Sequence, residues 1–355
     1  MTQQGLTVDT LSPDHPSFQP ADVKISPFIL SLPKAELHIH LEGAIAPDTL
    51  AELSRKYDGD AALTAESAAA LYSYPDFHGF LMAFKATTER LRAPEDYELI
   101  TYRMMERLAA ENVLHAEVIF SAGVAMRRGY DVHAIYAGCE RGRERGERDL
   151  GVSVMWIWDA VRHFGPEAAQ RVAEAAARHV GENTVAFGIG GDERRAGPEL
   201  FRDVFAWARG HGLRLTAHAG ESAGPESVWG ALNLGAERLG HALHAWQDPE
   251  LMAVLVERQA PIEACITSNL RTGCCAAIGQ HPVKNFFDLG AMVTLNSDDP
   301  AMFGTSLARE YALGQQQFGF TDEHLRELAR NSFEASFLPA EKKIAFLDRV
   351  DAVGG

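Results

Sequence analysis

The sequence predicts a (β/α)8 barrel with extra helices inserted after its first strand, and three observations support this fold class. Short apolar runs alternate with amphipathic helical stretches along most of the chain, which is typical of a parallel sheet covered by helices. Eight such runs are present, as a barrel of this class requires. An open nucleotide-binding sheet would carry a glycine-rich loop after its first strand, and Gly43 alone does not supply one.

The expected strands are nearly continuous apolar segments, because parallel strands of this kind are buried on both faces. In chain order they are Ala35–His40, Val113–Phe120, Val152–Trp158, Val185–Ile189, Arg214–His218, Arg238–His241, Ile262–Cys265 and Met292–Asn296. Amphipathic helices are expected between them, for example at Glu167–His179 and Glu199–His211. Gly212 follows the second helix, where a glycine can end it.

The connection between the first two strands is unusually long, at roughly seventy residues. Part of it carries large apolar side chains on one helical stripe, namely Phe77, Phe80, Leu81 and Phe84. Such a stripe ordinarily packs on the barrel. Inserted on the catalytic side, it would form an apolar lid over about residues 70–95.

Composition sets the domain organisation and excludes several classes of protein. Residues 1–25 are rich in Pro, Ser, Asp and Gln and predict a mobile tail, and residues 26–350 are expected to form one barrel. A net charge of −16 argues against nucleic-acid binding. Neither a membrane-spanning apolar run nor a signal peptide is recognisable. Four cysteines form no disulfide framework, so a cytoplasmic enzyme is expected.

Two histidines at the end of the first expected strand are the strongest chemical signal. His38 and His40 are one residue apart, and strand side chains alternate, so both imidazoles point to the same face. Two imidazoles on one face can chelate a divalent metal, and a carboxylate from a distant strand can complete the site. An isolated pair of this kind is weak evidence for a metal, so the other strand ends matter.

Residues suited to catalysis follow other strands as well. In a (β/α)8 barrel the active site forms where the strands end, and the candidates there are His218, Glu221, His241, Asp298 and Asp299. Three imidazoles with one carboxylate suit zinc and leave a position for water, and the expected ligands are His38, His40, His218 and Asp298. Zinc would lower the pKa of that water toward about 7.

The remaining polar side chains suit proton transfer. Glu221 follows the expected ligand His218 closely enough to donate a proton to a substrate. His241 and Asp299 would orient the water or accept its proton. A two-metal hydrolase would need a lysine or glutamate on the fourth strand, but residues 186–191 contain neither, which favours one zinc per chain.

Several motifs together resemble the adenosine deaminase family, and they lie at residues 32–43, 218–221, 267–269 and 297–300. The resemblance implies hydrolytic deamination of a 6-aminopurine, in which zinc-bound hydroxide adds to C6 and ammonia leaves. It further implies that Glu221 protonates purine N1, that His241 and Asp299 hold the hydroxide, and that Asp299 meets N7. The backbone N–H of Gly191 would meet N3, and residues 79–84 are similar to the apolar lid of the family.

Departures from the family pattern concern the substrate. Glu42 stands where nucleoside-specific members usually carry an aspartate that contacts the ribose 5′ oxygen, and glutamate occurs there in relatives that act on free adenine or on other adenine compounds. Gly188 replaces the usual aspartate three residues before Gly191, and the sequence alone offers no physical account of that change. Residues 236–241 and 268–273, in contrast, are more similar to the nucleoside branch.

Four arginines follow the second and fourth strands, namely Arg127, Arg128, Arg194 and Arg195. The simplest interpretation is ion pairing with Asp192, Glu193 or other surface acids. The alternative is a site for an anionic extension at the 5′ end of an adenosine derivative. Among substrates of family relatives, 6-aminodeoxyfutalosine, an adenine nucleoside that carries a benzoate, would fit such a site.

The sequence therefore predicts a zinc deaminase of an adenine nucleoside, with a small-molecule substrate and no nucleic-acid or membrane partner. A deaminase of free adenine is the first alternative. A catalytically inactive, ligand-binding barrel is an alternative of another class, disfavoured because every expected ligand and acid–base residue is present. The oligomeric state stays open.

Overall fold

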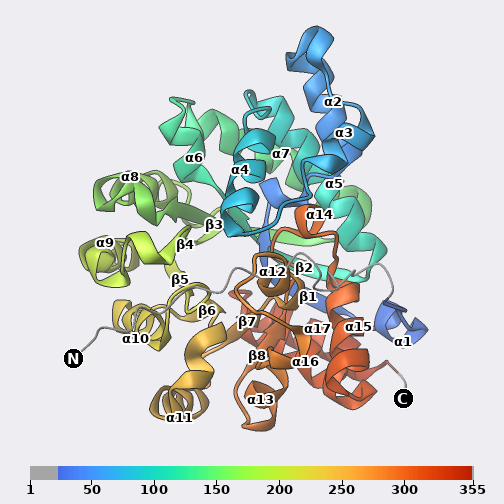
Figure 1. Cartoon of the computed structure of the whole chain (residues 1–355), viewed down its shortest axis with the longest axis vertical. Helices are drawn as coiled ribbons and strands as arrows, with labels where there is room; N and C mark the ends of the chain where they lie inside the picture. Colours follow the sequence, from blue (N-terminus) through green and yellow to red (C-terminus); the bar gives the residue numbers. More distant parts are fainter. Residues whose placement is uncertain (1–22, 354–355) are drawn as a thin grey trace, which may run out of the picture.

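A ring of parallel strands lies at the centre of the protein, with helices around it, in a computed structural model that describes residues 23–353 (Figure 1). Within these residues, eight strands pair side by side in sequence order. They are β1 (Lys34–His40), β2 (Val113–Phe120), β3 (Ser153–Val161), β4 (Thr184–Gly190), β5 (Arg214–Ala219), β6 (Arg238–His241), β7 (Ile262–Ala264) and β8 (Val293–Leu295). The predicted (β/α)8 barrel is confirmed.

The barrel closes where the first strand meets the chain just after the last one. Ile39 and Asp298 form a parallel bridge. The His40 N–H donates to the Asp298 carbonyl at 2.8 Å, and the Asp298 N–H donates to the His38 carbonyl at 3.0 Å. This seam joins the two sequence motifs that are farthest apart in the chain, and both carry expected metal ligands.

The connection from β1 to β2 contains the predicted extra helices, which are α2 (Pro47–Tyr57), α3 (Ala65–Ala70) and α4 (Phe77–Thr88), before α5 (Pro94–Ala110). The other helices surround the barrel or follow it, and they are α1 (Pro27–Ser31), α6 (Ala122–Arg127), α7 (Val132–Leu150), α8 (Pro166–Ala177), α9 (Arg202–Gly210), α10 (Pro225–Leu234), α11 (Pro249–Arg258), α12 (Ile266–Arg271), α13 (Val283–Asp288), α14 (Pro300–Phe303), α15 (Leu307–Phe318), α16 (Asp322–Ala335) and α17 (Ala340–Asp351). Many begin with proline, whose missing N–H costs nothing in the first turn.

The core lies between the strands and the ring of helices. Trp156, Trp158 and Phe187 from neighbouring strands are fully buried there. Every residue of β2 is buried, in agreement with the near-continuous apolar runs of the sequence. Val23 and Ile25 also pack against this core, whereas the rest of the expected tail, residues 1–22, lies outside the described residues.

Two elements differ from the prediction. Strand β3 continues to Val161 because its last residues pair with β4, with Asp159 opposite Gly188 and Val161 opposite Gly190. This extension places Asp159 inside the strand. The helix expected over residues 199–211 begins instead with a short 3-10 turn over residues 198–201, followed by α9.

Within residues 23–353, no helix is both long and apolar enough to cross a membrane. The four cysteines, Cys139, Cys265, Cys274 and Cys275, are all free thiols, as the sequence predicts.

Candidate active site

The four expected metal ligands lie together at the C-terminal end of the barrel. The Nε2 atoms of His38 and His40 are 3.4 Å and 3.3 Å from Asp298 Oδ1, and the Nε2 atoms of His40 and His218 are 3.2 Å apart. One ligand atom from each of the four side chains lies within 4.8 Å of all the others. The fold thus brings together side chains from β1, β5 and the seam after β8.

This cluster fits a divalent cation. The Nε2 atom of His38 is buried and has no hydrogen-bond partner among the described residues, so a cation between the rings would satisfy it. Burial, together with the neighbouring imidazoles, holds the pKa of His218 well below its ordinary value. Burial likewise lowers the pKa of His40 to about 4. Both rings are therefore neutral at pH 7, as metal ligands must be.

Other side chains orient the ligands. His38 Nδ1 lies 2.8 Å from Glu263 Oε2, His218 Nδ1 lies 3.2 Å from the Ile189 carbonyl, and Ser268 donates to Asp298 Oδ2 at 2.6 Å. Such contacts fix the ring orientation and the tautomer of a metal-binding histidine.

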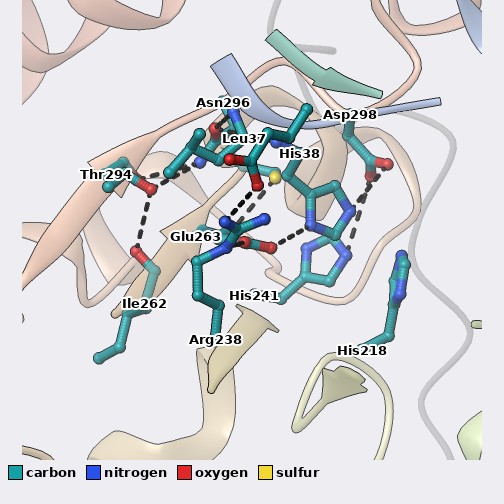
Figure 2. Close-up of polar contacts among 12 residues, drawn as sticks. Leu37, His38, His218, Arg238, His241, Ile262, Glu263, Thr294, Asn296 and Asp298 are labelled. Atoms are coloured by element: carbon teal, nitrogen blue, oxygen red, sulfur yellow. Dashed lines mark hydrogen bonds and ion pairs between the residues drawn. The ribbon is translucent and has the colours of Figure 1, made fainter. Parts of the chain in front are cut away.

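A buried ion-pair network extends from His38 into the barrel, and Figure 2 shows its first part. Arg238 Nε donates to Glu263 Oε1 at 2.6 Å, and Arg238 Nη1 pairs with Glu117. Arg238 is 1% exposed, and the ring of Phe337 lies 4.0 Å from its guanidinium carbon. Sequence analysis did not connect Arg238 or Glu263 with the metal cluster, because both lie within expected strands.

Glu221 projects from the loop after β5 and is buried. Burial, and secondarily the charge of Asp298, hold the pKa of Glu221 well above its ordinary value, so the side chain carries a proton that it can donate. The loop is held by Glu193, whose carboxylate accepts from the backbone N–H groups of residues 220–222 at 2.8–3.0 Å. Glu193 therefore positions Glu221, a role that sequence analysis missed.

A hydrogen-bonded chain fixes the tautomer of His241. The Val283 N–H donates to His281 Nδ1 at 3.3 Å, so the ring proton of His281 sits on Nε2 and is donated to Asn269 Oδ1 at 3.0 Å. Asn269 Nδ2 then donates to His241 Nδ1 at 3.1 Å. The remaining proton of His241 is therefore on Nε2, which lies 3.8 Å from Glu221 Oε1 and 3.9 Å from Asp298 Oδ2.

The backbone is strained at two of these residues. His241 and Asp298 adopt φ angles of +65° and +63°, a region that side chains other than glycine rarely occupy. Such strain persists only where the surroundings enforce it, and it is concentrated at functional sites.

Asp299 completes the group of predicted catalytic residues. Its Oδ1 atom is buried without a hydrogen-bond partner among the described residues. Burial, followed by the charge of Asp298, raises the pKa of Asp299 well above its ordinary value. Gly43 lies directly against it, since a Cβ atom at Gly43 would stand 1.7 Å from Asp299 Oδ1.

We expect Gly43→Ala to displace Asp299 and to lower kcat by about 10²-fold, because a shift of about 1 Å in a catalytic group costs that much. Metal content should not change, since the three atoms nearest to the added Cβ all belong to Asp299, which is not an expected ligand. Steady-state kinetics and metal analysis of the purified variant test both points. Gly210→Ala is the matched control, because a Cβ atom there would meet nothing within 4 Å. An unchanged kcat for Gly43→Ala would contradict the assignment.

A cavity of about 580 Å³ opens above the metal cluster. The residues that line it include Glu221, His241, Asp299 and Gly191, together with the predicted stripe of α4, namely Phe77, Phe80, Leu81 and Phe84. Phe80 packs against Phe303, with ring centroids 5.0 Å apart. Volumes of this order suit a ligand of drug size.

Glu42 is placed beside this cavity but does not line it. It is 1% exposed, and its carboxylate accepts from the Ser121 N–H at 3.2 Å. Burial raises the pKa of Glu42 to about 7. Ser121 itself lines the cavity, so in this structure Glu42 contacts a wall residue of the cavity.

Asp159 is a cavity residue that sequence analysis missed. It lines the cavity, and burial raises its pKa to about 8. It pairs in register with Gly188, where a Cβ atom would lie 3.3 Å from Asp159 Oδ1 and 2.9 Å from Thr216 Oγ1. The glycine leaves room for the carboxylate of the neighbouring strand, which gives a physical account of Gly188. The sequence feature that could have revealed this residue is that Asp159 is the lone carboxylate in the apolar run of β3.

The structure separates the four arginines into two pairs. Arg128 donates to the Thr88 carbonyl at the end of α4, and Arg194 Nε donates to the Ser222 carbonyl at 2.9 Å. Arg128 also lines the cavity, as do Arg127 and Arg195, but the last two make no side-chain hydrogen bond among the described residues. Within residues 23–353, neither guanidinium forms an ion pair with a carboxylate.

Comparisons with known proteins agree with this geometry. The sequence profile of the family described as adenosine deaminase matches residues 33–353. The chain belongs to the adenosine deaminase family. The resemblance predicted from the sequence motifs is thus confirmed, and this member of the adenosine deaminase family is a hydrolase that acts on C–N bonds. The alternative of a catalytically inactive barrel is therefore rejected.

Several relatives in the adenosine deaminase family are similar over nearly their full length. An aminodeoxyfutalosine deaminase of Streptomyces coelicolor is 36% identical over 98% of this chain and 90% of its own. An adenine deaminase of Rhizobium leguminosarum is 36% identical over 90% of this chain and 99% of its own. A solved amidohydrolase from Burkholderia ambifaria with bound zinc has a TM-score of 0.85 at 27% identity and covers 94% of this chain and 95% of its own.

Proposed function

We propose that the protein deaminates an adenine nucleoside, in particular one with an extension at its 5′ carbon such as 6-aminodeoxyfutalosine. Water adds to C6 of the purine and the C6–N bond breaks, so that the products are a 6-oxopurine and ammonia. The observation that carries the proposal is the cavity that Glu221, His241 and Asp299 line together with the metal cluster, where burial raises the pKa of Glu221. Residues 26–350 would form the catalytic domain, acting on its small substrate in the cytoplasm.

Glu221 is proposed as the proton donor. Its buried carboxylic acid would protonate purine N1 and so draw electrons away from C6 as the nucleophile attacks. Glu193 would keep the acid in place through the backbone of the loop. His241 would donate its Nε2 proton to a hydrogen bond with the attacking water, because the chain through Asn269 holds that tautomer.

Asp299 and Gly191 are proposed to hold the purine. Asp299 retains an unsatisfied buried oxygen, which suits it to meet N7 and the attacking water. Gly191 lines the cavity at a φ of +88°, and its N–H would meet N3. The α4 stripe would cover the ring as an apolar lid over about residues 70–95 and exclude bulk water.

The metal is proposed to be one zinc per chain, held by His38, His40, His218 and Asp298. Three imidazoles with one carboxylate are a donor set that zinc accepts. Zinc there would supply a water molecule acidic enough to act as nucleophile at neutral pH.

Elemental analysis should therefore return about one zinc per chain, and prolonged dialysis against a chelator should abolish activity, with recovery on addition of one equivalent of zinc. Two tightly bound metals per chain, both required for turnover, would contradict this assignment. Ser268→Ala removes a hydrogen bond to Asp298 and should weaken zinc binding by about 10–100-fold. This result would show that the zinc required for activity is the one bound by Asp298.

Free adenine is the second candidate substrate, and Glu42 favours it. The cavity volume favours the larger nucleoside, because a bare purine would leave much of the space up to Arg127 and Arg195 unfilled. The relatives named above include deaminases of both kinds. Loss of the 6-amino chromophore from adenine, adenosine and 6-aminodeoxyfutalosine distinguishes the candidates. We expect both nucleosides to exceed adenine in kcat/KM, and a preference for adenine would favour the second candidate.

A further inference from the structure

Two guanidinium groups without carboxylate partners lie at the outer part of the cavity. Arg127 ends α6, and Arg195 lies in the short 3-10 turn after β4. Both line the cavity and both are exposed at its rim. The protein has 49 acidic and only 33 basic residues other than histidine, so arginines are readily neutralised elsewhere on its surface. Two unpaired arginines beside one cavity therefore need a reason.

The surroundings of these arginines are aromatic and partly buried. The Arg127 guanidinium carbon lies 4.4 Å from the centre of the Phe164 ring, a contact that orients the planar group. Next to Phe164 is His163, whose Nδ1 atom is buried and has no hydrogen-bond partner among the described residues. Burial, together with the charges of Arg195 and Arg127, lowers the pKa of His163, so its ring is neutral.

The position of this group relative to Gly191 places it on the ribose side of the purine. A Cβ atom at Gly191 would lie 3.1 Å from His163 Nδ1, so the histidine is next to the backbone proposed to meet purine N3. N3 and N9 are both bonded to C4 of the purine, and N9 carries the sugar. A substituent at the 5′ carbon would leave the purine on this side, toward Arg127 and Arg195.

We propose that Arg127, Arg195 and His163 form a subsite that binds a carboxylate at the far end of the 5′ extension. The proposal rests on the nucleoside deamination proposed above and names the residues that select its substrate. A guanidinium presents two parallel N–H donors that match the two oxygens of a carboxylate. Phe164 and the α4 stripe would pack on an aromatic spacer between sugar and carboxylate. Asp192 also lines the cavity, and its carboxylate accepts from the backbone N–H of Arg194 at 3.1 Å rather than from Arg127 or Arg195.

The test compares 6-aminodeoxyfutalosine with its methyl ester, which lacks the charge and is larger by one methyl group. In the unaltered enzyme, kcat/KM should be about 10-fold higher for the acid, since hydrogen bonds to a charged group contribute that order of discrimination. The preference should weaken as salt rises. In Arg127→Ala and in Arg195→Ala the ratio should fall toward one. Arg171→Ala, an exposed arginine of α8, is the control and should keep the full ratio.

Three outcomes would overturn the proposal in different ways. Equal turnover of acid and ester by the unaltered enzyme would exclude an anion subsite while leaving nucleoside deamination intact. A higher kcat/KM for adenosine 5′-monophosphate than for the carboxylate substrate would assign the arginines to a phosphate. Retention of the acid preference in both arginine variants would place the selection elsewhere. Deamination of adenine alone would instead refute the proposed function on which the subsite rests.

Discussion

Glu221→Gln should lower kcat by about 10²–10⁴-fold, the range expected when a general acid is removed. The amide keeps the size and most of the polarity of the side chain, but it cannot deliver a proton to the purine ring. The backbone hydrogen bonds of the loop to Glu193 do not involve the Glu221 side chain, so the loop should stay in place. Zinc content should match that of the unaltered enzyme, because Glu221 is not among the expected ligands.

The control for this variant is Glu226→Gln, an exposed carboxylate five residues further along the chain. It makes the same change from carboxyl to amide near the same loop and should retain kcat within about 2-fold, as for other surface substitutions. A Glu221→Gln protein that has lost its zinc would mean that the residue binds the metal. One that retains full kcat would exclude Glu221 as the acid.

The pH profile gives a second readout of Glu221. Burial raises its pKa, and the acid acts only while protonated, so activity should fall as the pH rises through that raised pKa. The residual activity of Glu221→Gln should lack this alkaline decrease. If both proteins lose activity at high pH in the same way, the decrease must be due to another group.

The fold and the metal ligands could be predicted from the sequence because each depends on a local pattern. Buried parallel strands are apolar on both faces, so a polar residue at the end of such a run stands out. His38, His40, His218 and His241 could be selected on this basis. Asp298 is different, since nothing local shows that it meets His40. Only the rule that parallel strands of a barrel end at one face brings these residues together.

The rest of the site depends on contacts that no local pattern contains. Arg127 and Arg128 are neighbours in the sequence and both line the cavity, yet Arg128 donates to the end of α4 whereas Arg127 lies against the ring of Phe164. Asp159 lies in a strand that extends three residues past its predicted end, and the pairing with β4 that extends this strand is long-range. The role of Glu193 likewise depends on a loop about thirty residues away.

Arg238→Met should destabilise the protein by about 3–5 kcal/mol, because it leaves two buried carboxylates without their shared counter-charge. Arg238 is 1% exposed and lies between Glu117 and Glu263. Methionine fills a similar volume, so the loss reflects charge more than packing. Urea unfolding measures it. Zinc affinity should also fall, by about 10–100-fold, since Glu263 orients His38.

The pH dependence separates this electrostatic cause from a packing defect. Burial raises the pKa of Glu117, but Arg238, His115 and the Phe337 N–H together outweigh burial, and the pKa is lowered to about 2. That stabilisation is present above the unfolded pKa of about 4.3 and is lost as the pH falls toward 2. Without Arg238, burial is opposed only by His115 and the Phe337 N–H, so the pKa of Glu117 should rise and protonation on acidification should relieve part of its penalty. The stability difference between variant and wild type should therefore be largest near neutral pH and shrink as the pH falls.

Two further proteins make the test decisive. Adding Glu117→Gln to Arg238→Met removes one unpaired charge and should recover part of the loss. Arg214→Ala breaks an ion pair between Arg214 and Glu237, in which the arginine side chain is 50% exposed. This variant should lose less than about 1 kcal/mol of unfolding free energy. A deficit in Arg238→Met that is constant with pH and unaffected by Glu117→Gln would mean that the arginine acts through packing on Phe337 rather than through its charge.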